Sequence, residues 1–148
     1  MLRQKTIGIV IFRRQEKMIK YLLLHHEGEY WNFPKGRGEG LETEQDTALR
    51  ELQEETGITE VKIIEGFKEE YDYDFEREIE GGVSETFYKK AIFFLGEVKT
   101  SEVRISDEHL DFGWCDYDIA LKRLFFQNGQ DILKKAHQFL LKEQGFVL

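Results

Sequence analysis

The amino-acid sequence predicts an α/β fold in which one β-sheet packs between helices, and three observations support this prediction. Apolar runs with the length of single strands occur at residues 6–12, 21–24, 61–67 and 91–95. Segments with helical hydrophobic spacing interleave with these runs at residues 43–56 and 130–142. The length of 148 residues suits one hydrophobic core, so we expect a single domain over residues 1–148.

The first two apolar runs are expected to form a pair of strands. A polar segment at residues 13–18 separates residues 6–12 from residues 21–24 and is typical of a turn. The segment that follows, residues 31–40, holds the single proline of the chain and a cluster of glycines. This composition predicts a loop whose backbone has special conformational demands.

The first helix is expected at residues 43–56. Thr43 suits the N-cap position, with Asp46 three residues later, and Gly57 suits the left-handed position that ends a helix. The apolar stripe that can face the sheet consists of Ala48, Leu49 and Leu52. We therefore expect this helix to cover one face of the sheet.

A charged segment at residues 69–82 follows the expected strand at 61–67. We expect it to be an acidic loop that leads into a second strand pair ending at residues 91–95. Tyr71 and Tyr73 lie within it, where they could belong to a mobile lid or to the ordinary surface.

The net charge of −8 limits the partners of the chain. An acidic protein is repelled by polyanions, which argues against general nucleic-acid binding through a basic surface. A small phosphorylated substrate remains compatible with this charge if a divalent cation lies between the phosphates and the carboxylates. If the substrate is phosphorylated, the negative net charge therefore indicates a site for such a cation.

The cysteine content and the amino-terminal segment indicate the compartment. The chain has one cysteine, Cys115, which excludes an internal disulfide and a paired-cysteine zinc site, and we expect it to be a buried apolar residue. The first apolar run ends at Arg13 and is too short for a membrane span. We expect a cytoplasmic protein that does not cross a membrane.

The helix at residues 43–56 carries an acidic cluster. Glu51, Glu54 and Glu55 occupy positions i, i+3 and i+4, which places their carboxylates on neighbouring surface. Hard cations such as Mg²⁺ take oxygen ligands and relieve such repulsion. Arg50 could pair with Glu42 and hold the preceding loop against the helix. Taken alone, the cluster could also be a solvated acidic face.

The segment from residue 36 to residue 58 favours the cation site. Its fixed positions are Gly36, Glu42, Arg50, Glu51, Leu52, Glu54, Glu55, Gly57 and Ile58. At these spacings it resembles the signature of the Nudix hydrolase family at every fixed position. One departure lies at residues 40–42, where many members have Pro-Gly-Glu and this chain has Gly-Leu-Glu. The glutamate is retained, so the departure concerns the conformation of the loop.

The resemblance implies a Nudix-type α/β/α sandwich with a central mixed β-sheet, in which the signature forms a loop, a helix and a loop. It implies Mg²⁺ as cofactor, with Mn²⁺ as a possible substitute. The implied metal ligands are Glu51, Glu54 and Glu55. The implied catalytic residues are Glu54 as general base, Glu108 as the alternative base, and Arg50. Glu42 and Gly57 would support the site structurally.

Outside the signature, four stretches resemble the asymmetrical diadenosine tetraphosphate hydrolases of this family. They lie at residues 33–36, 63–67, 106–109 with Trp114, and 137–140. The resemblance covers residues 7–140 and implies a small-molecule dinucleoside polyphosphate as substrate. It implies metal-dependent water attack on a bridge phosphate of diadenosine tetraphosphate, releasing ATP and AMP.

The resemblance also suggests substrate-binding residues, each with a structural alternative. They are Lys35, Gly36, Lys89, His109 and Phe126. The two lysines could grip phosphates or face solvent, and His109 could donate to a phosphate or cap a turn. An aromatic ring such as Phe126 could stack on adenine, which contributes about 1–3 kcal/mol per base, or belong to the core. We expect His137 to be structural.

Two alternative functions remain open at this stage. An RNA 5′ pyrophosphohydrolase or a nucleoside triphosphate pyrophosphohydrolase of the same fold would use the same signature. A Nudix module that senses a nucleotide without cutting it would be expected to lack one of the clustered glutamates, and none is missing here. The sequence leaves the oligomeric state open.

Overall fold

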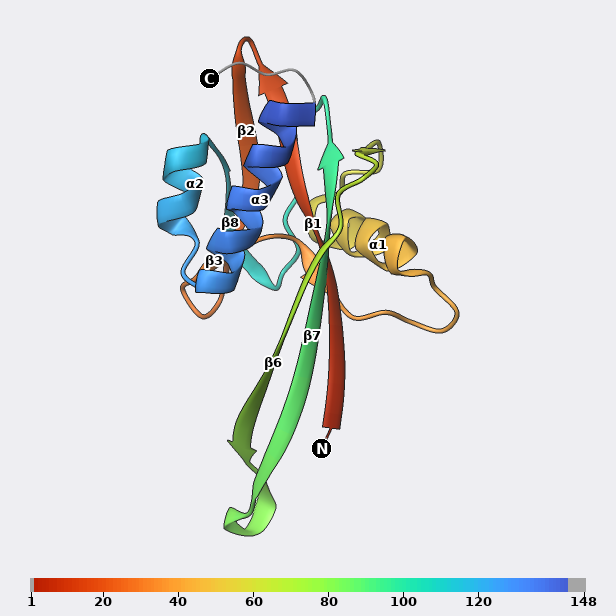
Figure 1. Ribbon diagram of the computed structural model, residues 1–148, viewed down its shortest axis with the longest axis vertical. Helices are drawn as coiled ribbons and strands as arrows, with labels where there is room; N and C mark the ends of the chain where they lie inside the picture. The colour runs from red at the N-terminus through yellow and green to blue at the C-terminus, as the bar shows by residue number, and fades with distance from the viewer. Residues whose placement is uncertain (1, 144–148) are drawn as a thin grey trace.

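The computed structural model describes residues 2–143 as a β-sheet covered by helices on both faces (Figure 1). The elements are β1 (Leu2–Gln15), β2 (Met18–His26), β3 (Trp31–Asn32), β4 (Lys35–Gly36), α1 (Glu44–Thr56), β5 (Lys62–Ile63), β6 (Glu69–Glu78), a 3₁₀ turn (Glu80–Gly82), β7 (Ser84–Glu97), β8 (His109–Cys115), α2 (Tyr117–Arg123) and α3 (Gln127–Glu143). The α/β class predicted from the sequence is therefore confirmed.

The sheet is mixed because its two longest strands run parallel. Strands β1 and β7 pair in parallel, with Thr6 opposite Ala91, whereas the other pairings between strands within residues 2–143 are antiparallel. The main order of strands is β3-β2-β1-β7-β5, and β4, β6 and β8 pair with β1, β7 and β2 respectively. The central mixed sheet implied by the family resemblance is confirmed.

Alternation along β1 divides the core into two layers. Successive side chains of a strand point to opposite faces. Val10 and Phe12 pack in the cluster that contains the buried residues of α3. The cluster beneath α1 contains Ile7, Ile9 and Ile11. In Figure 1, α1 lies on one side of the sheet and α2 with α3 on the other, so the molecule is an α/β/α sandwich.

Helix α1 begins and ends as the sequence predicts. Thr43 accepts a hydrogen bond from the backbone of Asp46, whose side chain accepts one from the backbone of Thr43, a reciprocal capping box. Gly57 adopts φ +75° and its N–H donates to the carbonyl of Gln53 at 2.8 Å. Of the predicted apolar stripe, Ala48 and Leu52 are buried in the core, and Leu49 is partly buried.

The strand expected at residues 61–67 is shorter than predicted, since β5 covers only Lys62–Ile63. The N–H of Ile64 still donates to a β7 carbonyl at 2.9 Å, but Gly66 then adopts φ +91° and turns the chain. Ile64 and Phe67 therefore pack in the core beneath α3 instead of continuing along the sheet.

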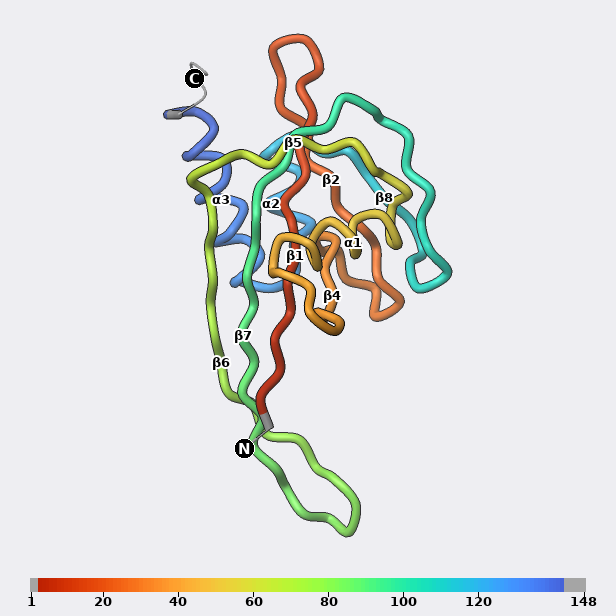
Figure 2. The backbone as a smooth tube through the Cα atoms, turned by 90° about the vertical axis from the view of Figure 1, so that its right-hand side faces the viewer, coloured from red at the N-terminus to blue at the C-terminus, as the bar shows by residue number. Residues whose placement is uncertain are grey.

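The acidic loop expected at residues 69–82 is instead largely strand β6, paired with β7 from Glu69 to Glu78. Acidic and aromatic residues alternate along this segment, and in a strand such alternation places the acidic side chains on one face and the aromatic side chains on the other. Beyond the body of the molecule, β6 and β7 continue as a long hairpin arm beside the beginning of β1 (Figures 1 and 2). Strand β8 and helix α2 were not predicted, and α3 begins three residues earlier than expected, at Gln127.

Two further expectations concern burial and membranes. Cys115 is buried at 4% exposure, as predicted, on the strand that pairs with β2. None of the helices within residues 2–143 is long and apolar enough to cross a membrane.

Candidate active site

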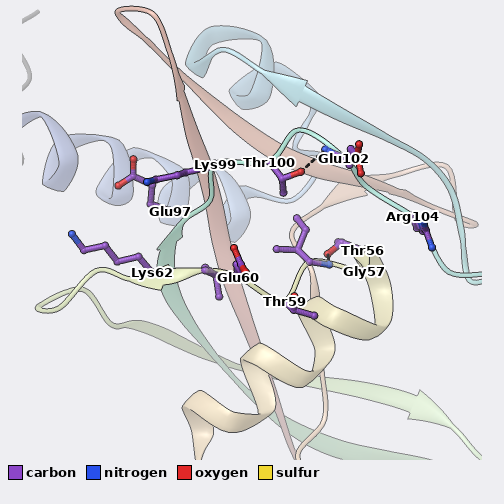
Figure 3. Close-up of a pocket in the computed structure, with 12 residues that line it drawn as sticks. Thr56, Gly57, Thr59, Glu60, Lys62, Glu97, Lys99, Thr100, Glu102 and Arg104 are labelled. Atoms are coloured by element: carbon purple, nitrogen blue, oxygen red, sulfur yellow. Dashed lines mark hydrogen bonds between the residues drawn. The ribbon is translucent and has the colours of Figure 1, made fainter.

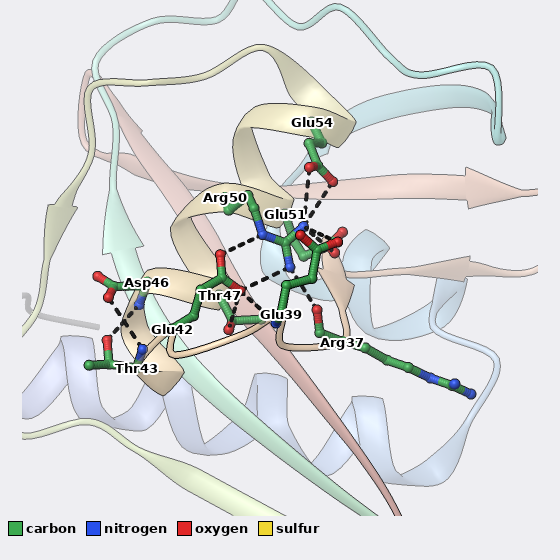
Figure 4. Close-up of polar contacts among 9 residues, drawn as sticks. All are labelled: Arg37, Glu39, Glu42, Thr43, Asp46, Thr47, Arg50, Glu51 and Glu54. Carbon is green, nitrogen blue, oxygen red and sulfur yellow. Dashed lines mark hydrogen bonds and ion pairs between the residues drawn. The ribbon is translucent and has the colours of Figure 1, made fainter.

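Arg50 is the centre of a network that ties the signature loop to α1 (Figure 4). Its Nε donates to Glu42 at 2.7 Å, and its Nη2 donates to the carbonyl oxygen of Arg37 at 2.7 Å. Its Nη1 donates to Glu51 at 3.0 Å and to both oxygens of Glu54 at 3.1 Å. One guanidinium thus holds the loop and orders two of the three clustered carboxylates.

Glu42 anchors the loop end of this network. Its carboxylate also accepts hydrogen bonds from the backbone N–H of Glu39 at 2.9 Å and from the Thr47 hydroxyl at 3.0 Å. The hydrogen bond from Arg50 and that from Glu39 hold the pKa of Glu42 at about 2. The predicted pairing of Glu42 with Arg50 is confirmed, and the Gly-Leu-Glu variation at residues 40–42 leaves it intact.

Glu55 is the buried member of the acidic cluster, with 5% exposure. Its Oε2 accepts a hydrogen bond from the backbone N–H of Lys35 at 3.2 Å, and its Oε1 lies 3.3 Å from Nε2 of His109. Burial raises the pKa of Glu55 to about 8 and lowers that of His109. Burial therefore disfavours the charged form of both side chains, which lie in direct contact.

Gly36 brings the loop backbone directly against α1. A Cβ atom placed on Gly36 would lie 2.0 Å from the carboxyl carbon of Glu51, so the Glu51 side chain would have to leave its position. The backbone of Gly36 also pairs with Ile7 of β1. Glycine at this position therefore leaves the space that the Glu51 carboxylate fills.

Glu54 and Glu108 are the exposed acids of the site. The side chain of Glu54 is 55% exposed, against 14% for Glu51. Glu108 is also exposed, and its charge raises the pKa of both Glu51 and Glu55, although burial is the largest cause in each case. The structure therefore brings Glu108 near the acidic cluster from a different segment of the chain.

The donor set of the cluster fits a hard divalent cation. The donors are carboxylate oxygens on one face of α1, and such oxygens are the ligands that Mg²⁺ prefers. The side chain of Glu51 is partly buried and that of Glu55 is fully buried. Within residues 2–143, no three acidic, histidine or cysteine side chains stand together as a ready-made ligand set. Arg50 occupies the space between Glu51 and Glu54 and His109 contacts Glu55, so a cation would replace these contacts.

A cleft of about 280 Å³ lies on the α3 side of the sheet, next to β4. It is lined by three of the residues that the sequence singled out for substrate binding, Lys35, Lys89 and Phe126. Burial lowers the pKa of both lysines, and the positive charge of Lys35 adds to this effect at Lys89. The two ammonium groups therefore share one partly desolvated space, which favours an anionic ligand.

Two aromatic side chains that sequence reasoning left undecided, Tyr71 and Tyr73, also line this cleft. Five further lining residues were not predicted from the sequence: Thr6, Tyr30, Asn32, Ala91 and Asn128. The alternation of acidic and aromatic residues in β6 was the available signal for the tyrosines, because it places them on one face of a strand. Tyr30 meets Phe126 edge to face at 5.2 Å, so these rings form an aromatic wall.

His109 does not line the cleft. It is 7% exposed, and its Nδ1 lies 2.9 Å from the Ser106 hydroxyl while its other nitrogen faces Glu55. The ring of His26 packs against it at 4.6 Å and stacks on Tyr30 at 4.8 Å, which connects the acidic cluster to the aromatic wall. Burial is the main cause of its lowered pKa and the charge of Lys35 adds to it, so His109 lies close to this lysine without lining the cleft.

A second, larger cavity of about 760 Å³ lies at the carboxyl end of α1 (Figure 3). Its walls come from residues 56–62 and 97–104, and they mix basic and acidic side chains such as Lys99, Arg104 and Glu60. Of the sequence-predicted site residues, only Gly57 contributes to it. Size alone does not make it the active site, since neither the clustered glutamates nor the cleft lysines line it.

Comparisons with known proteins agree with this geometry. The family model of the NUDIX domain matches residues 2–136. The asymmetrical bis(5′-nucleosyl)-tetraphosphatase of Sus scrofa is 36% identical over 148 residues, covering 92% of this chain and 95% of the relative. The RNA pyrophosphohydrolase of Bartonella bacilliformis is 34% identical over 156 residues, covering 92% of this chain and 91% of the relative.

A solved structure with the same architecture is the binary complex of a C. elegans Ap4A hydrolase. It has a TM-score of 0.79 and 29% sequence identity, and the match covers 93% of this chain and 98% of that one. Nudix hydrolases generally use divalent metal ions, which agrees with the oxygen-rich donor set of α1. The family match spans the loop, helix α1 and the cleft together, and this chain is therefore a hydrolase that belongs to the Nudix family.

Proposed function

We propose that this chain hydrolyses diadenosine tetraphosphate to ATP and AMP with Mg²⁺ as cofactor. The observation that carries the proposal is the cleft, where Lys35 and Lys89 lie among aromatic rings immediately beside the acidic cluster of α1. A dinucleoside polyphosphate offers both an anionic bridge and flat bases to such a site. The similarity to named asymmetrical tetraphosphatases supports this choice of substrate.

The lysines and the aromatic wall would bind and orient the substrate. The ammonium groups of Lys35 and Lys89 would bind oxygens of the phosphate bridge in a space where water screens them weakly. Tyr30 and Phe126 would present their rings to one adenine. Because β4 joins the cleft to α1 through the hydrogen bond from Lys35 to Glu55, the bound bridge would lie next to the carboxylates.

Glu51, Glu54 and Glu55 would hold the divalent cation, with Mn²⁺ as a possible replacement for Mg²⁺. The bound cation would polarise a phosphoryl oxygen and lower the pKa of a bound water. Glu54, the most exposed of the three, would accept the proton of the attacking water, and Glu108 is the alternative base. Arg50 would keep the loop and α1 in register through Glu42.

Product analysis tests this proposal. The purified chain is incubated with Mg²⁺ and diadenosine tetraphosphate, and the products are separated and quantified. Equal amounts of ATP and AMP, abolished by a chelator, are expected. Formation of ADP alone, or absence of cleavage, would contradict the proposal.

One alternative substrate has a specific observation in its favour, the 34% identity to an RNA pyrophosphohydrolase. The same acidic cluster would then release phosphate or pyrophosphate from the 5′ end of a triphosphorylated RNA. The net charge of −8 disfavours contacts with a long polyanion. Faster turnover of triphosphorylated RNA than of diadenosine tetraphosphate, at equal concentrations, would favour this alternative.

A further inference from the structure

The hairpin arm carries an uninterrupted aromatic ladder on the same face as the cleft. Along β6, the ring centroids of Tyr71 and Tyr73 are 6.2 Å apart, and those of Tyr73 and Phe75 are 5.9 Å apart. Phe75 stacks on Phe87 of β7 at 5.3 Å. Since Tyr71 and Tyr73 already line the cleft, the ladder extends the aromatic surface of the cleft outward along the arm.

Two basic side chains lie along this ladder. Lys89 lies directly opposite Tyr73, and the guanidinium of Arg77 lies 5.7 Å from the ring centre of Phe75 and 4.8 Å from that of Phe87. In the described part of the chain, neither Lys89 nor Arg77 forms an ion pair with a carboxylate. Both positive charges thus remain available to a phosphate or a base.

The opposite face of β6 has a different chemistry. It presents Glu70, Asp72, Asp74, Glu76 and Glu78, since side chains alternate along the strand. Asp72 accepts a hydrogen bond from Tyr88, and Glu70 pairs with Lys90 at 3.6 Å. This face repels anions, so a phosphorylated ligand is restricted to the aromatic face.

We propose that the arm face formed by Tyr73, Phe75 and Arg77 binds the second nucleoside of a dinucleoside polyphosphate. The proposal rests on the proposed function and adds a distal base site to it. Tyr73 is 39% exposed, so a base can stack on its ring, and Arg77 can cover that base from the outer end of the ladder. From Tyr71 in the cleft to Phe75 on the arm, the strand rises by about 13 Å, a span comparable to an extended polyphosphate bridge.

Two compounds that differ only in the second nucleoside test this site. Diadenosine tetraphosphate and adenosine 5′-tetraphosphate carry the same number of phosphates, but only the first has a base for the arm. The variants are Phe75→Leu and Arg77→Gln. The matched control is Glu76→Gln, which lies on the same strand and faces the opposite side. Circular dichroism and melting temperature verify that the arm variants remain folded.

For both arm variants we expect KM for diadenosine tetraphosphate to rise about fivefold or more, the lower end of the range for loss of one stacked base. KM for adenosine 5′-tetraphosphate, or its inhibition constant if it is not cleaved, should change less than twofold. The Glu76→Gln control should behave as wild type. Equal effects on the two compounds, or no effect on either, would overturn the distal base site.

Equilibrium titration in chelator separates this proposal from the proposed function. If wild type fails to produce ATP and AMP but binds diadenosine tetraphosphate in a manner sensitive to Phe75→Leu, the arm site holds and the reaction assignment fails. If wild type produces ATP and AMP while both arm variants keep the wild-type KM and affinity, the reaction assignment holds and the arm site fails.

Discussion

The three clustered glutamates differ in how far their side chains are exposed to solvent. The exposed fraction of the side chain is 55% for Glu54, 14% for Glu51 and 6% for Glu55. A general base must reach a water molecule, whereas ligands of a cation gain from partial withdrawal from solvent. This difference is the physical reason for proposing Glu54 as the general base.

Glu54→Gln should lower kcat by about 100-fold or more, because general-base catalysis contributes about 10²–10⁴-fold. The melting temperature should stay near that of wild type, since the side chain is exposed. Glu60→Gln, an exposed position just beyond α1, is the control. Unchanged turnover of Glu54→Gln would show that the reaction does not depend on this carboxylate.

Lys89 and Lys90 form a matched pair on β7. Lys89 faces the cleft, whereas Lys90 faces the other side and pairs with Glu70 at 3.6 Å. Lys89→Ala should raise KM for diadenosine tetraphosphate about tenfold, the loss of roughly one charge-assisted hydrogen bond. Lys90→Ala should leave KM near the wild-type value. A drop in melting temperature without a change in KM for Lys89→Ala would assign this lysine a structural role.

The residues of the acidic cluster could be predicted from the sequence, but the rest of the cleft could not. Glu42, Arg50 and the glutamates of α1 interact within one short segment, so spacing along a helix nearly determines their geometry. Tyr30, Asn32 and Asn128 line the cleft only because β2, β3 and the beginning of α3 meet there. Such non-local contacts leave no periodic pattern in one sequence.

Among the elements, α1 was predicted most closely because its signals are local. A capping box at Thr43 and a left-handed Gly57 mark both ends. Strand β6 was missed because its charge resembles that of a loop, although its alternation of residue types was present in the sequence. Helix α2 has a capping Asp116 but only 7 residues, which is too short for a hydrophobic period to be recognised.

Gly57→Ala should destabilise the chain by about 1 kcal/mol, because a residue with a Cβ is strained at φ +75°. Gly57→Asn should cost less, since asparagine tolerates the left-handed conformation. Chemical denaturation of the three proteins measures the difference. Equal stability of Gly57→Ala and wild type would mean that the helix end relaxes to another conformation.

Across the whole molecule, His137 connects three elements. Its Nδ1 lies 2.7 Å from the Tyr21 hydroxyl of β2, and its ring stacks on Tyr117 of α2 at 4.0 Å. Burial lowers the pKa of His137, while the nearby charge of Asp118 opposes the shift. The expectation that His137 is structural agrees with these contacts.

This lowered pKa predicts an acid-sensitive stability. Below about pH 6.5 the unfolded chain binds a proton at His137 that the folded chain does not bind, so stability is fully present at higher pH and is lost as pH falls. Between pH 7.5 and 5.5, the melting temperature of wild type should fall more steeply than that of His137→Gln. Parallel curves for the two proteins would contradict this assignment.

The acidic face of β6 has a consequence for the behaviour of the protein at high concentration. Within the described residues, β6 pairs only with β7, so its other side is an open edge with unpaired backbone groups. The open edge of a long strand can pair with a strand of another chain, which extends the sheet. Charged side chains on the edge strand oppose this pairing. The five acidic residues that exclude phosphates from one face of the arm thereby also protect the protein against self-assembly into extended sheets.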